Sequence, residues 1–122
     1  MAIQKTLYVL AVFDLEKSAA YYQSVLGFSI HEIGDPGWRM FVKDTCRIMA
    51  GHCPEAIQPS ELGDHAYFGY FVVDDVDTYF DFVVSRGAEL IKPLKSEPWG
   101  MREFGIRTID GHRIMVGQDL EA

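Results

Sequence analysis

The chain has 122 residues, 48% of them apolar, 24% charged and 13% aromatic, which suits one compact domain and is too short for two large ones. Eighteen acidic residues against eleven basic ones give a formal net charge of −7, which disfavours nucleic acid and anionic membranes and favours neutral or cationic partners. No apolar run approaches the roughly 18 residues of a spanning helix, and the first residues lack a signal-peptide pattern, so we expect a cytoplasmic protein.

In chain order, the first predicted elements are a strand and a helix. The apolar run at residues 8–14 ends in Asp14, a residue type that favours the N-cap of a helix. Apolar side chains then recur at helical spacing as far as Leu26, and Gly27 stands where a left-handed C-terminal cap is expected. These signals predict a strand followed by an amphipathic helix.

The same signals return in the second half of the chain. The run at residues 69–75 again ends in an aspartate, and a second helical stripe stops at Gly87. Three pairs of segments match in order, at offsets of 61, 63 and 66 residues: 8–14 with 69–75, 37–41 with 100–104, and 47–51 with 113–117. The sequence therefore predicts two repeated units.

Turn signals complete each unit as strand, helix, strand, strand, strand. Asp110 and Gly111 predict a hairpin in the second unit, where the first has the shorter connection at residues 43–45. Residues 52–64 contain two prolines and no periodicity, and we interpret them as the linker between the units. One helix cannot cover both faces of a sheet, so the other face is expected to line a groove.

Alternation along the first strand of the second unit assigns side chains to the two faces. We expect Phe71 and Val73 to pack against the helix, and Phe68, Tyr70 and Val72 to point into the groove. A shift of one residue in register would exchange the two sets.

Two motifs resemble those of one known family. They are V-x-D-L-E-K-S-x-x-Y-Y-x-x-V-L-G-F at residues 12–28 and the D-G-H-R-I hairpin at residues 110–114. They resemble the vicinal oxygen chelate superfamily, which includes glyoxalase I, extradiol dioxygenases, fosfomycin-resistance enzymes and bleomycin-resistance proteins. The resemblance implies an α+β fold in which two βαβββ modules form a curved mixed sheet around a groove, usually in a homodimer. It implies a single domain at 1–122, with module one at 1–57 and module two at 62–122.

The resemblance also indicates where metalloenzymes of this superfamily hold their ion. Their ligands come from the first and last strands of each unit, and those positions here carry Leu7, Phe68, Met49 and Met115. None of these side chains is a competent ligand for a hard or borderline divalent ion. We therefore expect no metal and no cofactor.

Histidines and cysteines do not supply a replacement ligand set. His52, His65 and His112 each lie three residues from one of those positions, so in a continuous strand each faces the opposite side. Cys46 and Cys53 lack the spacing of a metal finger or a disulfide framework and are expected to be free thiols.

A third motif narrows the resemblance to one branch. The string P-W-G-M-R-E-F at residues 98–104 resembles the P-W-G-R-E-F motif of bleomycin-resistance proteins. That branch is implied to consist of metal-free acidic dimers, which sequester a cationic antibiotic between aromatic side chains without modifying it. Trp99 matches the tryptophan of the motif, and Trp38 falls where the branch carries an aromatic residue. Both tryptophans lie in segments with glycine and proline, where stiff turns position them to stack on a ligand. The alternative is that they only cap the barrel mouth or fill the dimer interface.

Glu103, inside the same motif, allows two interpretations. It either attracts a cationic ligand or pairs with Arg102 or Arg39, and we favour the pairing.

We predict a metal-free protein that binds a flat aromatic small molecule, cationic or neutral, by stacking at a groove in a dimer interface, with antibiotic resistance as one role. The alternative is a metal-dependent glyoxalase-like lyase or extradiol-type dioxygenase with atypical ligands; a third hypothesis is an accessory protein that binds a metabolite for regulation or storage. No residue is assigned a catalytic role. The predicted ligand-binding residues are Trp38, Trp99, Phe68, Tyr70, Met49, Met115, Arg102, Glu103 and Phe104.

Overall fold

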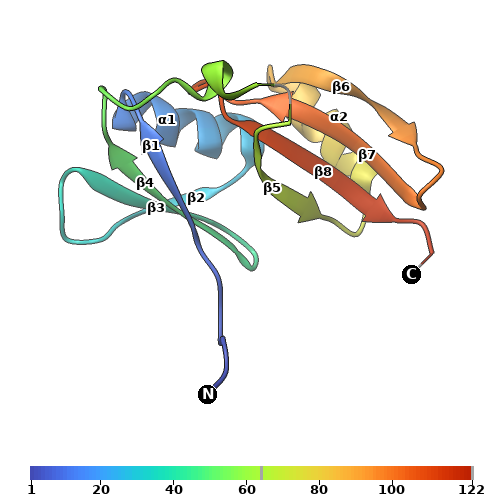
Figure 1. Cartoon of the computed structure of the whole chain (residues 1–122), viewed down its shortest axis with the longest axis horizontal. Coiled ribbons are helices and arrows are strands. Elements are labelled where there is room, and N and C mark those ends of the chain that lie inside the picture. The colour runs from blue at the N-terminus through green and yellow to red at the C-terminus, as the bar shows by residue number, and fades with distance from the viewer. Residues whose placement is uncertain (64, 122) are drawn as a thin grey trace. The chain divides into compact units, whose positions relative to one another are not determined.

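The computed structural model describes residues 1–63 and 65–121 and divides the chain into two compact units, at 1–57 and 58–122. The predicted linker at 52–64 and module two each include a residue outside the described part, Asp64 and Ala122. Each unit contains one four-stranded mixed sheet and one main helix (Figure 1). The predicted α+β fold with two βαβββ modules is confirmed.

Unit 1 has the strand order β1-β4-β3-β2, in which β1 runs parallel to β4 and the other pairs are antiparallel. The long crossover from β1 to β2 contains the helix, as a parallel arrangement requires. The elements of unit 1 are β1 (Tyr8–Val12), α1 (Leu15–Tyr21), η1 (Tyr22–Leu26), β2 (Ser29–Glu32), β3 (Trp38–Lys43) and β4 (Cys46–His52).

Unit 2 repeats this topology with the order β5-β8-β7-β6, preceded by a short 3-10 turn. In Figure 1, α2 lies behind the strands of this sheet. The elements of unit 2 are η2 (Pro59–Leu62), β5 (Tyr67–Val72), α2 (Val76–Ser85), β6 (Glu89–Ser96), β7 (Met101–Arg107) and β8 (Arg113–Asp119).

The helix termini follow the sequence signals. The side chain of Asp14 accepts a hydrogen bond from the backbone N–H of Lys17 at 3.2 Å, and Asp75 accepts one from Thr78 at 3.1 Å. Each is an N-cap contact, which typically contributes about 1 kcal/mol. Gly27 (φ 82°) and Gly87 (φ 97°) adopt the left-handed conformation after the two helices.

The first helix differs from a regular α-helix in its last turn. The α-helical part ends at Tyr21, and Tyr22–Leu26 form a π-helical turn. Tyr22 is completely buried, and its ring packs against those of Phe28 and Phe41, with centroids 5.4 and 4.6 Å away. Tyr22, Val25 and Leu26 of this wider turn are all buried. A regular helical period of 3.6 residues does not predict such a turn.

Each sheet has two faces. We call the side that packs against the helix of the same unit the helix face, and the opposite side the open face. In unit 2, Phe104 is completely buried and packs edge-on against Phe80 of α2, with ring centroids 5.2 Å apart. Its strand partner Val116 is also completely buried, which places both on the helix face. Alternation then puts Glu103, Met115 and the other residues of that parity on the open face.

Strand β5 follows the predicted alternation except at one position. Tyr70 on the open face is 39% exposed and Phe71 is half-buried. The register of β5 against β8 shifts between Tyr67 and Gly69, so Phe68 occupies a bulge. Plain alternation predicts that Phe68 shares the open face with Tyr70. Its ring instead lies 6.3 Å from that of Phe71, so this prediction is wrong.

Neither α1 nor α2, nor any other described helix, has the length and apolar character needed to cross a membrane. Both cysteines are free thiols, as predicted, with Cys53 exposed and Cys46 partly buried. Burial raises the pKa of Cys46 to about 11. Its thiolate, the reactive form, is therefore scarce at neutral pH.

Candidate functional site

The open face of unit 2 is organised around the carboxylate of Glu103. Although charged, Glu103 is only 4% exposed. Its Oε1 accepts hydrogen bonds from the hydroxyl of Tyr70 at 2.9 Å and from the indole N–H of Trp99 at 3.1 Å. Its Oε2 lies 3.3 Å from Nζ of Lys92, which is also 3.6 Å from Glu97. One buried carboxylate therefore fixes two aromatic side chains and one ammonium group.

These contacts shift the acid–base properties of the cluster. Burial alone would raise the pKa of Glu103, but the hydrogen bonds from Trp99 and Tyr70 and the ion pair with Lys92 lower it overall. Burial, followed by the hydrogen bond to Glu103 and its negative charge, raises the pKa of the Tyr70 hydroxyl. At neutral pH the cluster therefore holds an ionised glutamate and a neutral tyrosine.

The loop between β6 and β7 presents Trp99 on this face. The backbone N–H of Gly100 donates to the carbonyl of Glu97 at 3.1 Å, and Gly100 has a φ of 86°, which favours glycine. The indole of Trp99 is held at its N–H, yet the residue is 61% exposed. Much of its flat surface is thus fixed in place and uncovered.

Tyr70 lies directly over a glycine of the neighbouring strand. A Cβ atom at Gly117 would overlap the hydroxyl oxygen of Tyr70 and lie 2.8 Å from its Cζ. A residue without a side chain is therefore required under the ring.

Unit 1 has a related arrangement at the repeat-equivalent glycine. A Cβ atom at Gly51 would lie 2.7 Å from Cη2 of Trp38, so the indole packs on the backbone of β4. Trp38 and Gly51 are strand partners, and Met40 and Met49 form the next pair of the same face. The open face of unit 1 therefore carries a tryptophan beside two methionines.

Substitution Gly117→Ala is expected to displace Tyr70 and to break its hydrogen bond with Glu103. We expect the free energy of unfolding to fall by about 1–3 kcal/mol, the range for overpacking at a tight site. Denaturant unfolding measures this change. In the control Gly37→Ala the new Cβ would meet only Asp35, at 3.4 Å, an ordinary contact, and we expect a change below about 0.5 kcal/mol. Equal losses in both variants would contradict the proposed role of Gly117.

Six of the nine predicted site residues lie on or beside the open faces of the two sheets: Trp38 and Met49 in unit 1, and Tyr70, Trp99, Glu103 and Met115 in unit 2. Arg102, however, binds Asp77 of α2, with Nη2 and Oδ1 2.9 Å apart, and lies on the helix face. Phe104 lies in the core, and the ring of Phe68 is 5.7 Å from that of His112.

The expected pairing of Glu103 with Arg102 or Arg39 is wrong. Neighbouring strand residues point to opposite faces, which separates Glu103 from Arg102. Arg39 in unit 1 instead binds Glu16 of α1 at 3.1 Å and lies 4.0 Å from Glu32. Glu103 takes Lys92, from the next strand, as its cationic partner.

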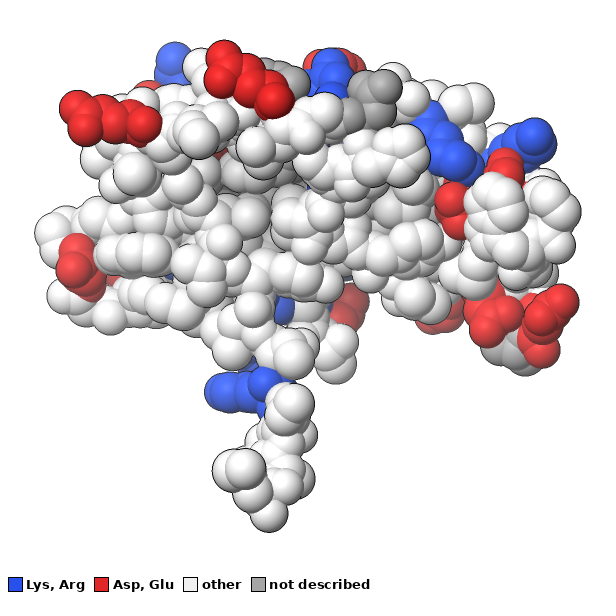
Figure 2. Space-filling model, viewed as in Figure 1, with Lys and Arg blue, Asp and Glu red and all other residues white. Residues whose placement is uncertain are grey.

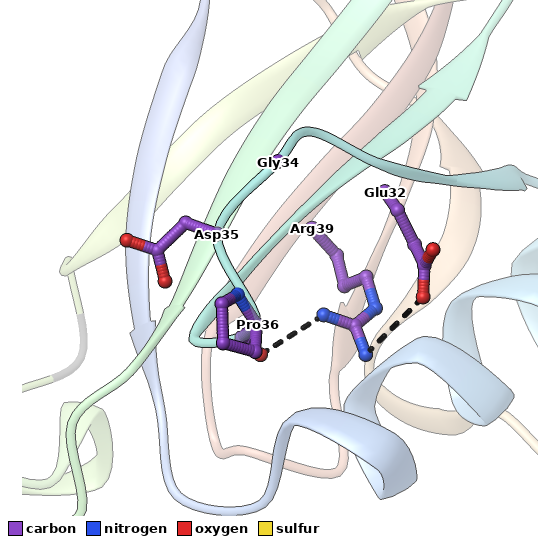
Figure 3. A pocket seen from close by; sticks show the side chains of 5 residues that line it. All are labelled: Glu32, Gly34, Asp35, Pro36 and Arg39. Carbon is purple, nitrogen blue, oxygen red and sulfur yellow. Dashed lines mark hydrogen bonds and ion pairs between the residues drawn. The ribbon is translucent and has the colours of Figure 1, made fainter.

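Arg39 also lines a hollow of about 250 Å³ in unit 1, together with Glu32, Gly34, Asp35 and Pro36 (Figure 3). Its Nη1 donates to the carbonyls of Pro36 and Trp38 at 3.1 and 2.9 Å. The guanidinium is thus occupied by groups of its own unit. We therefore take the aromatic open faces as the better candidate for a ligand site.

Sequence reasoning missed Lys92 and Glu97 as members of the Glu103 cluster. Lys92 reaches Glu103 because β6 lies beside β7, and Lys92 is the strand partner of Gly105. No local motif announces such a contact between strands. Gly51 and Gly117, which lie under aromatic rings, could have been noticed in the sequence, because each is the last residue of a matched repeat segment.

Comparison with known proteins gives the family. Residues 5–116 match the model of the Glyoxalase/Bleomycin resistance protein/Dioxygenase superfamily. The chain belongs to this superfamily. A search of curated proteins finds no match.

Solved structures of the superfamily fold resemble the chain over nearly its whole length. TioX from Micromonospora sp. ML1 is 24% identical with a TM-score of 0.72, and the match covers 94% of this chain and 95% of TioX. A glyoxalase-related enzyme from Clostridium phytofermentans is 17% identical with a TM-score of 0.78, covering 98% and 97%. A protein of unknown function from Agrobacterium tumefaciens is 27% identical with a TM-score of 0.71, covering 97% and 95%.

Metalloenzymes of the superfamily raise the question of whether this member's residues fit a divalent ion. At the positions implied for ligands, Leu7 and Phe68 offer only hydrocarbon, and Met49 and Met115 offer thioethers, which suit soft ions. Across residues 1–63 and 65–121, no three histidine, cysteine or acidic side chains gather in a way that could hold a metal. Glu103, the buried carboxylate of the open face, already has an ammonium group as its cation. These donors do not fit a hard or borderline divalent ion.

Proposed function

We propose that this superfamily member binds a small, flat aromatic molecule by stacking and holds it without modifying it. The observation that carries the proposal is Trp99, which is 61% exposed while its indole N–H is bonded to the buried Glu103. Contiguous exposed apolar patches typically mark binding sites, and Trp99 shares the Oε1 atom of Glu103 with a second aromatic residue, Tyr70. Fixing the indole before binding lowers the entropy cost of ordering it around a ligand.

The energetics of stacking support binding without chemistry. A planar ring on an aromatic side chain gains about 1–3 kcal/mol, by analogy with base stacking. Tyr70, held by the same carboxylate, gives unit 2 a second ring, and Met115 is its strand partner. In unit 1, Trp38 with Met49 forms a comparable apolar surface. Methionine beside aromatic rings suits adaptable recognition of apolar ligands.

The charge preference of the ligand does not come from Glu103. Its carboxylate already accepts two hydrogen bonds and has Lys92 as its cation, so it offers little further attraction to a cationic ligand. Figure 2 shows a surface that is largely uncharged over the strands, with acidic side chains toward the edges of the view. The net charge of −7 remains a weak, long-range preference against anions in solution. We therefore propose that the stacking site does not select a cationic ring.

A second candidate is a metal-dependent lyase or dioxygenase with atypical ligands, since one of the similar structures is a glyoxalase-related enzyme. The donor set at the four implied positions argues against it. Elemental analysis of the purified protein separates the two functions. Stoichiometric zinc, nickel, manganese or iron would contradict the metal-free proposal, as would turnover that depends on one of these ions.

The binding proposal is tested by calorimetric titration of the protein with bleomycin-type compounds and bicyclic intercalating aromatics. For a compound that binds, we expect Trp99→Ala to weaken affinity about tenfold or more, the equivalent of losing one stack. The control is Ile109→Ala, because Ile109 is an apolar residue of unit 2 that is 56% exposed, close to the exposure of Trp99. The absence of binding across the panel, or an equal loss in both variants, would refute the proposal.

A further inference from the structure

Three buried cationic nitrogens belong to residues of β6, β7 and β8 that share the open face of the unit 2 sheet. Within residues 1–63 and 65–121, Nζ of Lys92, Nε of Arg107 and Nη1 of Arg113 have no hydrogen-bond partner. Lys92 is balanced by its ion pairs with Glu103 and Glu97, and Arg107 by Glu89, whose Oε2 is 2.8 Å from Nη1. The described residues give Arg113 no ion pair.

Strand register places the two arginines side by side. Arg107 of β7 and Arg113 of β8 are direct partners, two residues beyond the pair Gly105 and Met115 on the same open face. Like charges at such positions repel each other, with Cβ atoms about 5 Å apart. Arg113 is only 7% exposed. A buried guanidinium beside another and without its own carboxylate is costly unless an anion joins it.

The repeat shows that this pair is particular to unit 2. The residue equivalent to Arg113 in unit 1 is Arg47, which is partly exposed and faces Val42 across the strands. Unit 1 therefore has one arginine where unit 2 has two. The second cation is not needed to build the shared topology.

We propose that Arg107 and Arg113 form a binding site for an anionic group, a carboxylate or a phosphate, on the open face of unit 2. Guanidinium groups bind such anions through paired hydrogen bonds. We also propose that this anionic group is part of the stacked aromatic ligand, and this second step rests on the proposed function. Arg113 is two residues along β8 from Met115, the strand partner of Tyr70, a separation of about 7 Å. The ligand class is then a flat aromatic acid.

The anion site is tested on its own with inorganic phosphate. At constant ionic strength, we expect phosphate to raise the melting temperature of the wild-type protein and of Arg47→Gln, the repeat-equivalent control, but not of Arg113→Gln. Without phosphate, Arg113→Gln should be at least as stable as the wild type, because the substitution removes the repulsion. A large loss of stability in Arg113→Gln, or an undiminished response to phosphate, would overturn the proposal.

The link to the aromatic ligand is tested by calorimetric titration with 2-naphthoate and with neutral 2-naphthamide. We expect the wild type to prefer 2-naphthoate about tenfold, the effect of one charge-assisted contact. Arg113→Gln should lose this preference and still bind 2-naphthamide, whereas Trp99→Ala should weaken both. Equal affinities in the wild type would overturn the anion site and leave the stacking proposal standing. A phosphate response that needs Arg113, with neither naphthalene bound, would support the anion site and count against stacking.

Discussion

Replacing Phe104 with alanine is expected to lower the free energy of unfolding by about 4 kcal/mol. The side chain is completely buried on the helix face and packs against Phe80 of α2. Its removal loses the burial of a large aromatic ring and leaves a cavity in the core of unit 2. Equilibrium denaturant unfolding monitored by circular dichroism measures the loss.

The conservative variant Phe104→Leu separates a core residue from a ligand contact. We expect a smaller cost, about 1–2 kcal/mol, because leucine refills much of the space. Its affinity for an aromatic probe should equal that of the wild type. A variant that is fully stable but binds the probe tenfold more weakly would move Phe104 back to the ligand site.

The second large effect is expected at Glu103. Glu103→Ala removes the acceptor of Tyr70 and Trp99 and one counter-ion of Lys92, so we expect a loss of about 3 kcal/mol of stability. Glu103→Gln keeps an acceptor for both rings and should lose less. The matched control is Asp77→Asn, which breaks the exposed ion pair with Arg102 and should cost no more than about 1 kcal/mol.

The Glu103 contribution should depend on pH with a defined sign. The pKa of Glu103 lies below its ordinary value of 4.5 in the folded protein, so the folded state favours the ionised form. The stabilisation is present above pH 4.5 and is lost as the pH falls through the folded-state pKa. The stability difference between wild type and Glu103→Gln should therefore shrink in acid. A difference that grows in acid would mean that the carboxylate is not stabilised in its charged form.

The fold could be predicted from sequence because its signals are local and occur twice. Asp14 and Asp75 cap the two helices, and Gly27 and Gly87 end them, as the sequence indicates. Matched apolar segments then determine which strands correspond. The π-helical turn at Tyr22–Leu26 had no such signal, because it depends on packing in the folded unit.

The site was predicted less well because side-chain direction changes at every strand residue. The motif at residues 98–104 draws attention to Arg102, Glu103 and Phe104 together, but only Glu103 lies on the open face. At Phe68, one bulge cancels an assignment made by alternation. Lys92 joins Glu103 through the pairing of two strands, a contact without a local sequence signature.

The proposal that Trp99 is a ligand-facing ring fixed by Glu103 is tested most directly by nuclear magnetic resonance. The chain has two tryptophans, so nitrogen-15 labelling gives two indole N–H resonances, which Trp38→Phe assigns. During titration with the bicyclic aromatic that binds best by calorimetry, the Trp99 indole resonance should move with the calorimetric saturation curve. A resonance of Trp99 that stays fixed while the probe saturates the protein would contradict the claim.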